Sequence, residues 1–124
     1  MRHLRPISVV MLFKLLVFHS SAPPESPTII DVEASVSNAV VRWKFGDNGG
    51  LELIALKLQY KEESESRWQE IQIKPPNRVK YTIMDLKSNT DYKFRILATN
   101  SLGTSPPSST YLAKTGKAGM CGVL

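Results

Sequence analysis

Apolar and polar residues alternate strictly along the second half of the stretch Leu86–Thr99. The side chains on one face are apolar: Tyr92, Phe94, Ile96 and Ala98. The side chains between them include two cations, Lys93 and Arg95. A period of two residues is typical of a strand with one buried face. Because Tyr92 follows a polar turn, we expect a tyrosine corner, in which the ring enters the core and the hydroxyl bonds to backbone upstream.

Six other short segments carry a period of two or a short apolar run, and turn residues separate them. These segments are residues 29–32, 39–45, 53–61, 68–73, 81–84 and 109–114. Glycine, proline, aspartate and asparagine gather in residues 46–50 and 100–107, where they favour loops. No segment shows a helical period. The sequence therefore predicts an all-β fold, a seven-stranded antiparallel β-sandwich with Greek-key links.

The inward-facing positions of these strands define a predicted structural core. They are aromatic or aliphatic, as burial between two sheets requires. The predicted core consists of Trp43, Leu56, Leu58, Tyr60, Leu86, Tyr92, Phe94 and Ile96. We expect Trp43 and Tyr92 above all to be structural residues rather than ligand-binding ones.

The two ends of the chain differ from its middle. Residues 1–22 combine a basic start, an apolar run and small residues at the end, which resembles a secretory signal peptide. Lys14 interrupts the apolar run and Pro23 follows the candidate cleavage point, so a disordered or amphipathic leader is the alternative. The run is too short for an ordinary membrane-spanning helix. We therefore expect a leader at 1–22, one domain at 23–115 that opens with a proline-rich spacer, and a disordered tail at 116–124.

Composition removes most catalytic chemistry from the predicted domain. The chain has 124 residues and a formal net charge of +5, which does not by itself indicate nucleic acid binding. Its single cysteine, Cys121, excludes an intradomain disulfide and a cysteine-based zinc cluster. Both histidines, His3 and His19, lie in the leader, so the domain has no histidine and no cysteine, which removes most nucleophile and metal chemistry. We expect no enzyme activity, no cofactor, no metal site and no nucleic acid partner.

The last four residues, Cys121–Leu124, formally match a prenylation box with a geranylgeranyl-type last residue. Gly122 is unusual in such a box, and a secreted chain would not meet the cytosolic transferase. A chance tail or a free thiol is the alternative interpretation.

A candidate basic binding face lies on the outward positions of two strands that are neighbours in this fold. It consists of Lys57, Lys61, Lys93 and Arg95, and we call it the basic face. Such a face can bind heparan sulfate, an acidic lipid surface or an acidic partner protein. The alternative is an ordinary solvated face, whose field Glu62, Glu63 and Glu65 would partly neutralise.

The joint spacing of residues between Pro24 and Thr115 resembles the fibronectin type III family. Trp43 stands where the family places its core tryptophan, on the second strand. The other matches are Leu53, Leu56, Leu58 and Tyr60 in the third strand, Leu86, Thr90 and Tyr92 at the corner, and Asn100, Gly103 and Ser105–Ser108 before the last strand. Ser88 and Asn89 replace the family's frequent Pro-Gly, but Asn89 tolerates the left-handed turn that the corner needs.

The resemblance implies an immunoglobulin-like sandwich and a non-catalytic module for protein–protein interaction. The loop Asp47–Gly50 and Trp68 are similar to modules of adhesion receptors, which implies cell adhesion or cell-surface recognition by a secreted or extracellular protein. Giant intracellular muscle proteins carry similar loops, so a cytoplasmic structural or spacer module is the alternative. The loop Thr99–Ser105 lacks an integrin-binding Arg-Gly-Asp, and no asparagine begins an N-glycosylation sequon. Members of the family mostly occur in arrays, so a single domain with short tails is unusual, and a truncated product of a larger gene is an open alternative.

Overall fold

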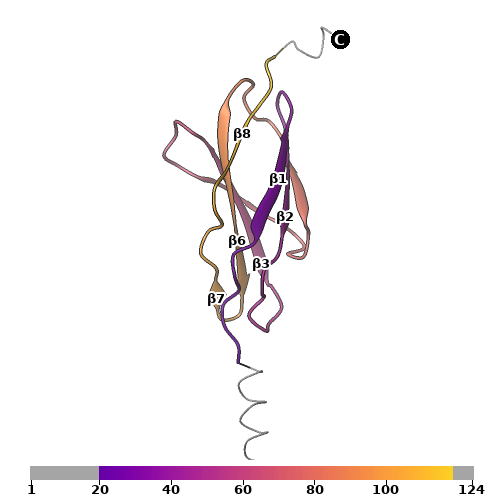
Figure 1. Cartoon of the computed structure of the whole chain (residues 1–124), viewed down its shortest axis with the longest axis vertical. Helices are drawn as coiled ribbons and strands as arrows, with labels where there is room; N and C mark the ends of the chain where they lie inside the picture. The colour runs from indigo at the N-terminus through magenta and orange to yellow at the C-terminus, as the bar shows by residue number, and fades with distance from the viewer. Residues whose placement is uncertain (1–19, 119–124) are drawn as a thin grey trace, which may run out of the picture.

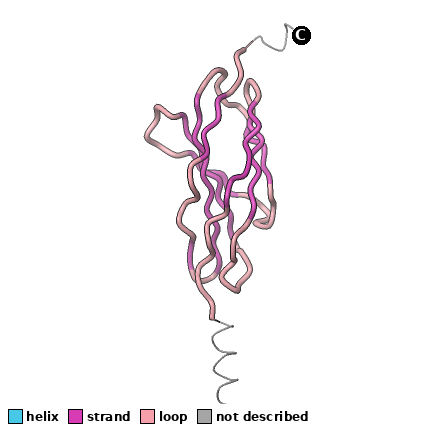
Figure 2. Tube along the Cα trace, in the orientation of Figure 1, coloured by secondary structure: helices cyan, strands magenta, loops and turns pink. Residues whose placement is uncertain are grey.

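Two antiparallel β-sheets form a sandwich in the computed structural model of the chain, which describes residues 20–118 (Figure 1). One sheet has the order β1-β2-β5; the other has the order β4-β3-β6, with β7 and β8 both paired to β6. The strands are β1 (Thr28–Ala34), β2 (Ala39–Lys44), β3 (Ala55–Glu62), β4 (Gln69–Gln72), β5 (Lys80–Ile83), β6 (Asp91–Asn100), β7 (Gly103–Thr104) and β8 (Tyr111–Lys114). The described residues form strands and loops, with no helix among them (Figure 2). The predicted all-β antiparallel sandwich is confirmed.

The last strand is split in two, which gives eight strands where the sequence predicted seven. Both pieces, β7 and β8, pair with β6. Between them lie Pro106 and Pro107, which have no N–H for a continuous ladder. A side chain compensates for part of this gap, because the Ser105 hydroxyl accepts a hydrogen bond of 3.0 Å from the Ala98 N–H. The sequence predicted a strand over residues 109–114, which contain β8, but placed residues 100–107 in a loop, because β7 consists of two residues only.

The core lies between the two sheets and is built from alternate residues of the longer strands. Seven of the predicted core residues are buried: Trp43, Leu56, Leu58, Leu86, Tyr92, Phe94 and Ile96. Tyr60 is half-buried instead and packs against the edge of the core, because it lies near the end of β3. Six further residues complete the core: Ile29, Ala39, Val41, Ile73, Ile83 and Ala98.

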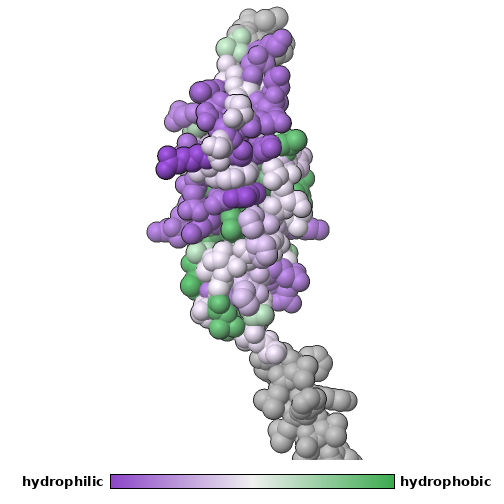
Figure 3. Space-filling view, turned by 90° about the vertical axis from the view of Figure 1, so that its left-hand side faces the viewer, coloured by the Kyte–Doolittle hydropathy of each residue, from purple (hydrophilic) through white to green (hydrophobic). Residues whose placement is uncertain are grey.

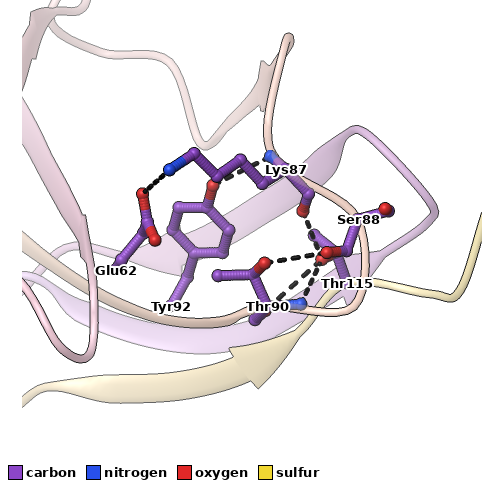
Figure 4. A network of polar contacts seen from close by, with 6 residues as sticks. All are labelled: Glu62, Lys87, Ser88, Thr90, Tyr92 and Thr115. Atoms are coloured by element: carbon purple, nitrogen blue, oxygen red, sulfur yellow. Dashed lines mark hydrogen bonds and ion pairs between the residues drawn. The ribbon is translucent and has the colours of Figure 1, made fainter.

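A tyrosine corner forms just before β6, as the sequence predicted (Figure 4). The backbone N–H of Lys87 donates a hydrogen bond of 2.9 Å to the hydroxyl of the buried Tyr92. Asn89 has a φ of 52°, the left-handed conformation that this turn requires. The hydroxyl of Thr115 accepts a bond of 3.0 Å from the Thr90 N–H and donates to the Lys87 carbonyl. The corner and the end of the domain are thus joined, which fixes where β6 begins.

Asn100 connects three loops at the other end of β6. Its side-chain amide donates to the carbonyls of Ala22 at 2.7 Å and Asn48 at 2.9 Å. Its side-chain oxygen accepts from the N–H groups of Leu102 at 2.8 Å and Gly103 at 3.2 Å. The residue is 1 % exposed, so these bonds satisfy a polar group that burial would otherwise penalise. The sequence located Asn100 in a loop but did not predict this role.

The proline-rich segment before β1 packs against the sandwich. Pro24 and Pro27 are buried, and the Glu25 N–H donates a hydrogen bond of 2.8 Å to the Asp47 carbonyl. This segment is therefore part of the domain rather than a free spacer. The predicted leader and tail fall largely outside the described residues, as does Cys121. Within residues 20–118, no helix has the length and apolar character needed to cross a membrane.

Candidate functional site

The basic face lies on the outer side of the second sheet, over β3 and β6. The strand register places Lys61 directly opposite Lys93, and Gln59 directly opposite Arg95. Lys57 follows on β3, on the same side of the pleat as Gln59. All four predicted cations are partly exposed. The structure therefore brings together the residues that sequence reasoning assigned to this face.

Trp68, just before β4, lies beneath two of these cations. The Arg95 guanidinium carbon is 4.1 Å from the centroid of the indole ring, and the Lys61 ammonium is 5.3 Å from it. The Arg95 Nε–H also donates a hydrogen bond of 2.6 Å to the Gln59 side-chain oxygen. Stacking and hydrogen bonding together hold the guanidinium in one place. Trp68 was not predicted to lie on this face. Residues two apart in a strand share one side of the sheet, so the spacing of Trp68 and Glu70 indicates that both point to the same side.

Glu70, on β4, is an acidic neighbour that sequence reasoning missed. Its carboxylate lies 3.9 Å from the Lys57 ammonium and accepts a hydrogen bond of 3.1 Å from the Gln59 amide. Gln59 thus links Glu70 on one side to Arg95 on the other. The positive charge of the basic face is consequently weakened at Lys57 and stronger toward β6.

Lys61 and Lys93 face each other across two paired strands. Like charges directly opposite in a sheet destabilise it, because their Cβ atoms lie only about 4.5–5.5 Å apart. No ion pair among residues 20–118 involves Lys93. An anionic group placed over this pair would relieve the repulsion. The face is therefore electrostatically suited to an acidic ligand.

Of the three glutamates expected to weaken this face, Glu62 pairs with a residue outside the face. Glu62 lies opposite Tyr92 and forms an ion pair of 3.0 Å with Lys87, away from the face. The Lys61 ammonium donates to the backbone carbonyl of Glu65 rather than to its carboxylate. Glu63 and Glu65 are exposed in the turn after β3. Figure 3 shows hydrophilic residues gathered over the upper half of the side drawn there, with hydrophobic ones lower down.

Two ionisable side chains with shifted pKa values lie beside the tyrosine corner, off the basic face. The hydrogen bond to Glu62, and the charge of that carboxylate, raise the pKa of Lys87 (Figure 4). Burial, and then the neighbouring Tyr92, raise the pKa of Tyr60. Both shifts favour the protonated form that is already present at neutral pH, so neither prepares a general base or a nucleophile.

Candidate metal ligands do not cluster in the part of the chain that the structure describes. Within residues 20–118, no group of three or more histidine, cysteine, aspartate or glutamate side chains is placed to hold a metal ion. What the outer face offers is two cations, Arg95 and Lys61, over an indole ring, which is chemistry for binding.

Comparison with known sequences finds relatives over most of the chain. The family profile described as "Fibronectin type III domain" matches residues 22–113. "Cell adhesion molecule DSCAM" of Homo sapiens is 33% identical over 101 residues, which is 82% of this chain and 5% of that protein. "Cell adhesion molecule DSCAML1" of Gallus gallus is 31% identical over 105 residues, or 85% of this chain and 5% of that protein. "Titin" of Drosophila melanogaster is 34% identical over 96 residues, or 76% of this chain.

Solved structures agree with the fold. A crystal structure of titin domains superposes with a TM-score of 0.68 at 24% identity, over 78% of this chain and 34% of that one. A myokine structure superposes with a TM-score of 0.66 at 23% identity, over 76% of this chain and 99% of that one. The chain spans only a small part of the length of the curated relatives it matches.

Proposed function

This chain belongs to the fibronectin type III family, and we propose that it is a non-catalytic module that binds a partner protein in cell adhesion or cell-surface recognition. The adhesion molecules among its relatives support the setting. Domains of this family in such proteins are generally non-catalytic, in keeping with a domain that lacks histidine and cysteine. The predicted signal peptide would place the module outside the cell.

The basic face is the proposed contact surface. The observation that carries this assignment is the pairing of Lys61 with Lys93, beside an Arg95 held on Trp68. A fixed guanidinium binds an acidic partner at a smaller entropic cost than a mobile one. The partner is therefore proposed to be a protein with an acidic patch, and heparan sulfate is the second anionic ligand to test.

An intracellular spacer module is the second candidate function. The relative named titin, 34% identical over 96 residues, favours it. A spacer in the cytoplasm would need neither a leader nor a ligand for the basic face. Processing of residues 1–22 therefore separates the two functions.

Expression of the full chain in secreting animal cells tests the location. We expect the protein in the medium with residues 1–22 removed, as read by sequencing its N-terminus. The matched control is the same chain lacking residues 1–22, which should remain inside the cells. An intact Met1 on protein retained in the cells would contradict the extracellular function and favour the spacer.

Binding of the multimerised domain to cell surfaces tests the face. We expect Lys93→Glu to reduce binding strongly and Lys80→Glu, on the opposite sheet, to leave it nearly unchanged. Binding that survives heparinase treatment supports a protein partner, whereas loss on treatment assigns the face to heparan sulfate. Equal binding by both variants would contradict the assignment.

A further inference from the structure

A groove of about 740 Å³ opens between the loop that joins β2 to β3 and the loop that joins β4 to β5. Four apolar residues line it: Phe45, Leu53, Pro75 and Pro76. Phe45 and Leu53 are only half-buried and pack against the core from one side. Apolar surface is therefore left accessible in the groove, whose lining residues include none of the four cations of the basic face.

Hydrogen bonds hold the β2–β3 wall of the groove in shape. The Asp47 carboxylate accepts a bond of 2.7 Å from the Gly49 N–H, and the Asn100 amide donates one of 2.9 Å to the Asn48 carbonyl. Gly49 has a φ of 77°, and a Cβ there would lie 1.9 Å from the Ala22 carbonyl oxygen, so only glycine fits. This loop is consequently fixed by its surroundings although its composition is that of a flexible loop.

The opposite wall is also anchored. The Trp43 indole N–H donates a bond of 2.8 Å to the Arg78 carbonyl, and the Trp43 backbone N–H donates one of 3.0 Å to the Val79 carbonyl. Pro75 and Pro76 restrict the backbone on the groove side. A groove whose two walls are fixed before binding loses little conformational entropy when a ligand enters.

The charge of the groove is opposite to that of the basic face. Asp47 and Glu52 are among its lining residues, and no lysine or arginine is. The Asp47 carboxylate already accepts a hydrogen bond from the Gly49 N–H. Glu52 is exposed and takes part in no ion pair among residues 20–118. A ligand with an apolar group for the bottom and a cation for Glu52 would complement both features.

We propose that this groove binds an extended segment of a partner protein in which a proline or aliphatic residue adjoins a lysine or arginine. The apolar side chain would cover Phe45 and Leu53, and the cation would pair with Glu52. This site is separate from the basic face and goes beyond the proposed function, because it selects a basic segment rather than an acidic surface.

Selection of a displayed library of random short peptides on the purified full chain tests the proposal. We expect enrichment of peptides that carry a proline or aliphatic residue beside lysine or arginine. Asn77→Trp would fill the groove from its exposed rim and should abolish their binding. Glu52→Gln should raise their Kd about two- to fivefold, as the loss of one exposed ion pair does. The matched control Glu33→Gln, at an exposed position of β1, should leave the Kd unchanged.

Amide chemical shifts of each variant establish that it is folded before binding is compared. Shifts at Asp47, Glu52 and Asn77 on addition of an enriched peptide would support the groove. Enriched peptides that bind Asn77→Trp as well as the native chain would overturn the proposal. Failure to enrich any peptide, or enrichment of acidic ones at the groove, would overturn it as well.

Discussion

The two tryptophans of this chain occupy opposite environments. Trp43 is 2 % exposed, lies among core side chains, and donates its indole N–H to the Arg78 carbonyl. Trp68 is half-buried on the outer side of the second sheet and lies under Arg95 and Lys61. The Trp43 ring is packed inside the domain, whereas the Trp68 ring makes cation–π contacts with two cations of the basic face. We therefore expect the inner side of the sandwich to contribute most of the stability, whereas Trp68 on the outer side positions two cations.

The largest contrast should appear when each tryptophan is replaced by alanine. Trp43→Ala removes a buried ring and leaves a cavity, so we expect a loss of about 3–5 kcal/mol in the free energy of unfolding. Trp68→Ala removes two cation–π contacts at the surface and should cost about 1 kcal/mol. Urea unfolding followed by tyrosine fluorescence would measure both. Equal losses would contradict the division between the two faces.

The tyrosine corner should give the next largest effect. Tyr92→Phe keeps the buried ring but removes the acceptor of the Lys87 N–H, so we expect a loss of about 1–3 kcal/mol. Tyr111→Phe is the matched control, since no hydrogen bond of the described residues uses the Tyr111 hydroxyl. Thermal unfolding of both variants would check the difference. A melting temperature of Tyr92→Phe equal to that of the control would show that the corner bond contributes nothing.

Charge changes on the outer face should alter binding to anions and leave the fold intact. Glu70→Gln removes a carboxylate beside Lys57, and Lys93→Gln removes a cation, so their elution from a polyanion resin should shift to higher and lower salt respectively. Each substitution should change the free energy of binding to the resin by about 1 kcal/mol or less. Lys80→Gln, on the opposite sheet, serves as the control and should shift elution less than Lys93→Gln. Identical shifts for the two lysine variants would mean that the resin senses only net charge.

The smallest expected effect concerns alkaline stability. Burial and Tyr92 raise the pKa of Tyr60 above its ordinary value of 10.0, so the folded state holds this proton more tightly than the unfolded state. The resulting stability is present below pH 10.0 and is lost as the pH rises through the folded-state pKa. Tyr60→Phe should remove about a few tenths of a kcal/mol of this loss, a small amount because the side chain is only half-buried and solvent screens the charge on its oxygen. The hydrogen bond to Glu62 raises the pKa of Lys87. This contact is present in the native chain and in the variant, so both still lose some stability at alkaline pH.

Parallel unfolding titrations at neutral pH and above pH 10.0 would measure this difference. The native chain should lose more stability between the two conditions than Tyr60→Phe does. A variant that loses more than the native chain would contradict the direction of the Tyr60 pKa shift.

The sandwich was predictable because burial leaves each strand few alternatives. The alternation of Tyr92, Phe94 and Ile96 permits one inner side, and the short turns permit antiparallel neighbours only. The split last strand was not predictable, because β7 is a pair of residues whose extent depends on where Pro106 and Pro107 interrupt the ladder. The alternation within each strand therefore determines which side faces the core. Pairing between strands that are distant in sequence determines where short strands such as β7 begin and end.

The sequence predicted which four cations share the outer side of β3 and β6, but not the contacts that these side chains make. Lys57, Lys61, Lys93 and Arg95 follow from the same alternation that defines the core. Their contacts with Trp68 and Glu70 depend on which residues of β4 lie beside β3, and on side-chain conformations that no sequence period reports. The role of Asn100 and the presence of the groove were not predicted for a related reason. Each is formed by loops that are distant from one another in sequence.

The central claim is that the outer side of the second sheet recognises a partner while the inner side holds the domain together. Its most direct test is to measure cell-surface binding and urea unfolding on one preparation of the variant Lys61→Glu/Lys93→Glu, with Lys44→Glu/Lys80→Glu on the other sheet as the control. We predict that the first variant loses binding while its free energy of unfolding falls by about 1 kcal/mol or less, and that the control keeps both its binding and its stability. Retained binding by the first variant, or loss of binding only together with the fold, would contradict the claim.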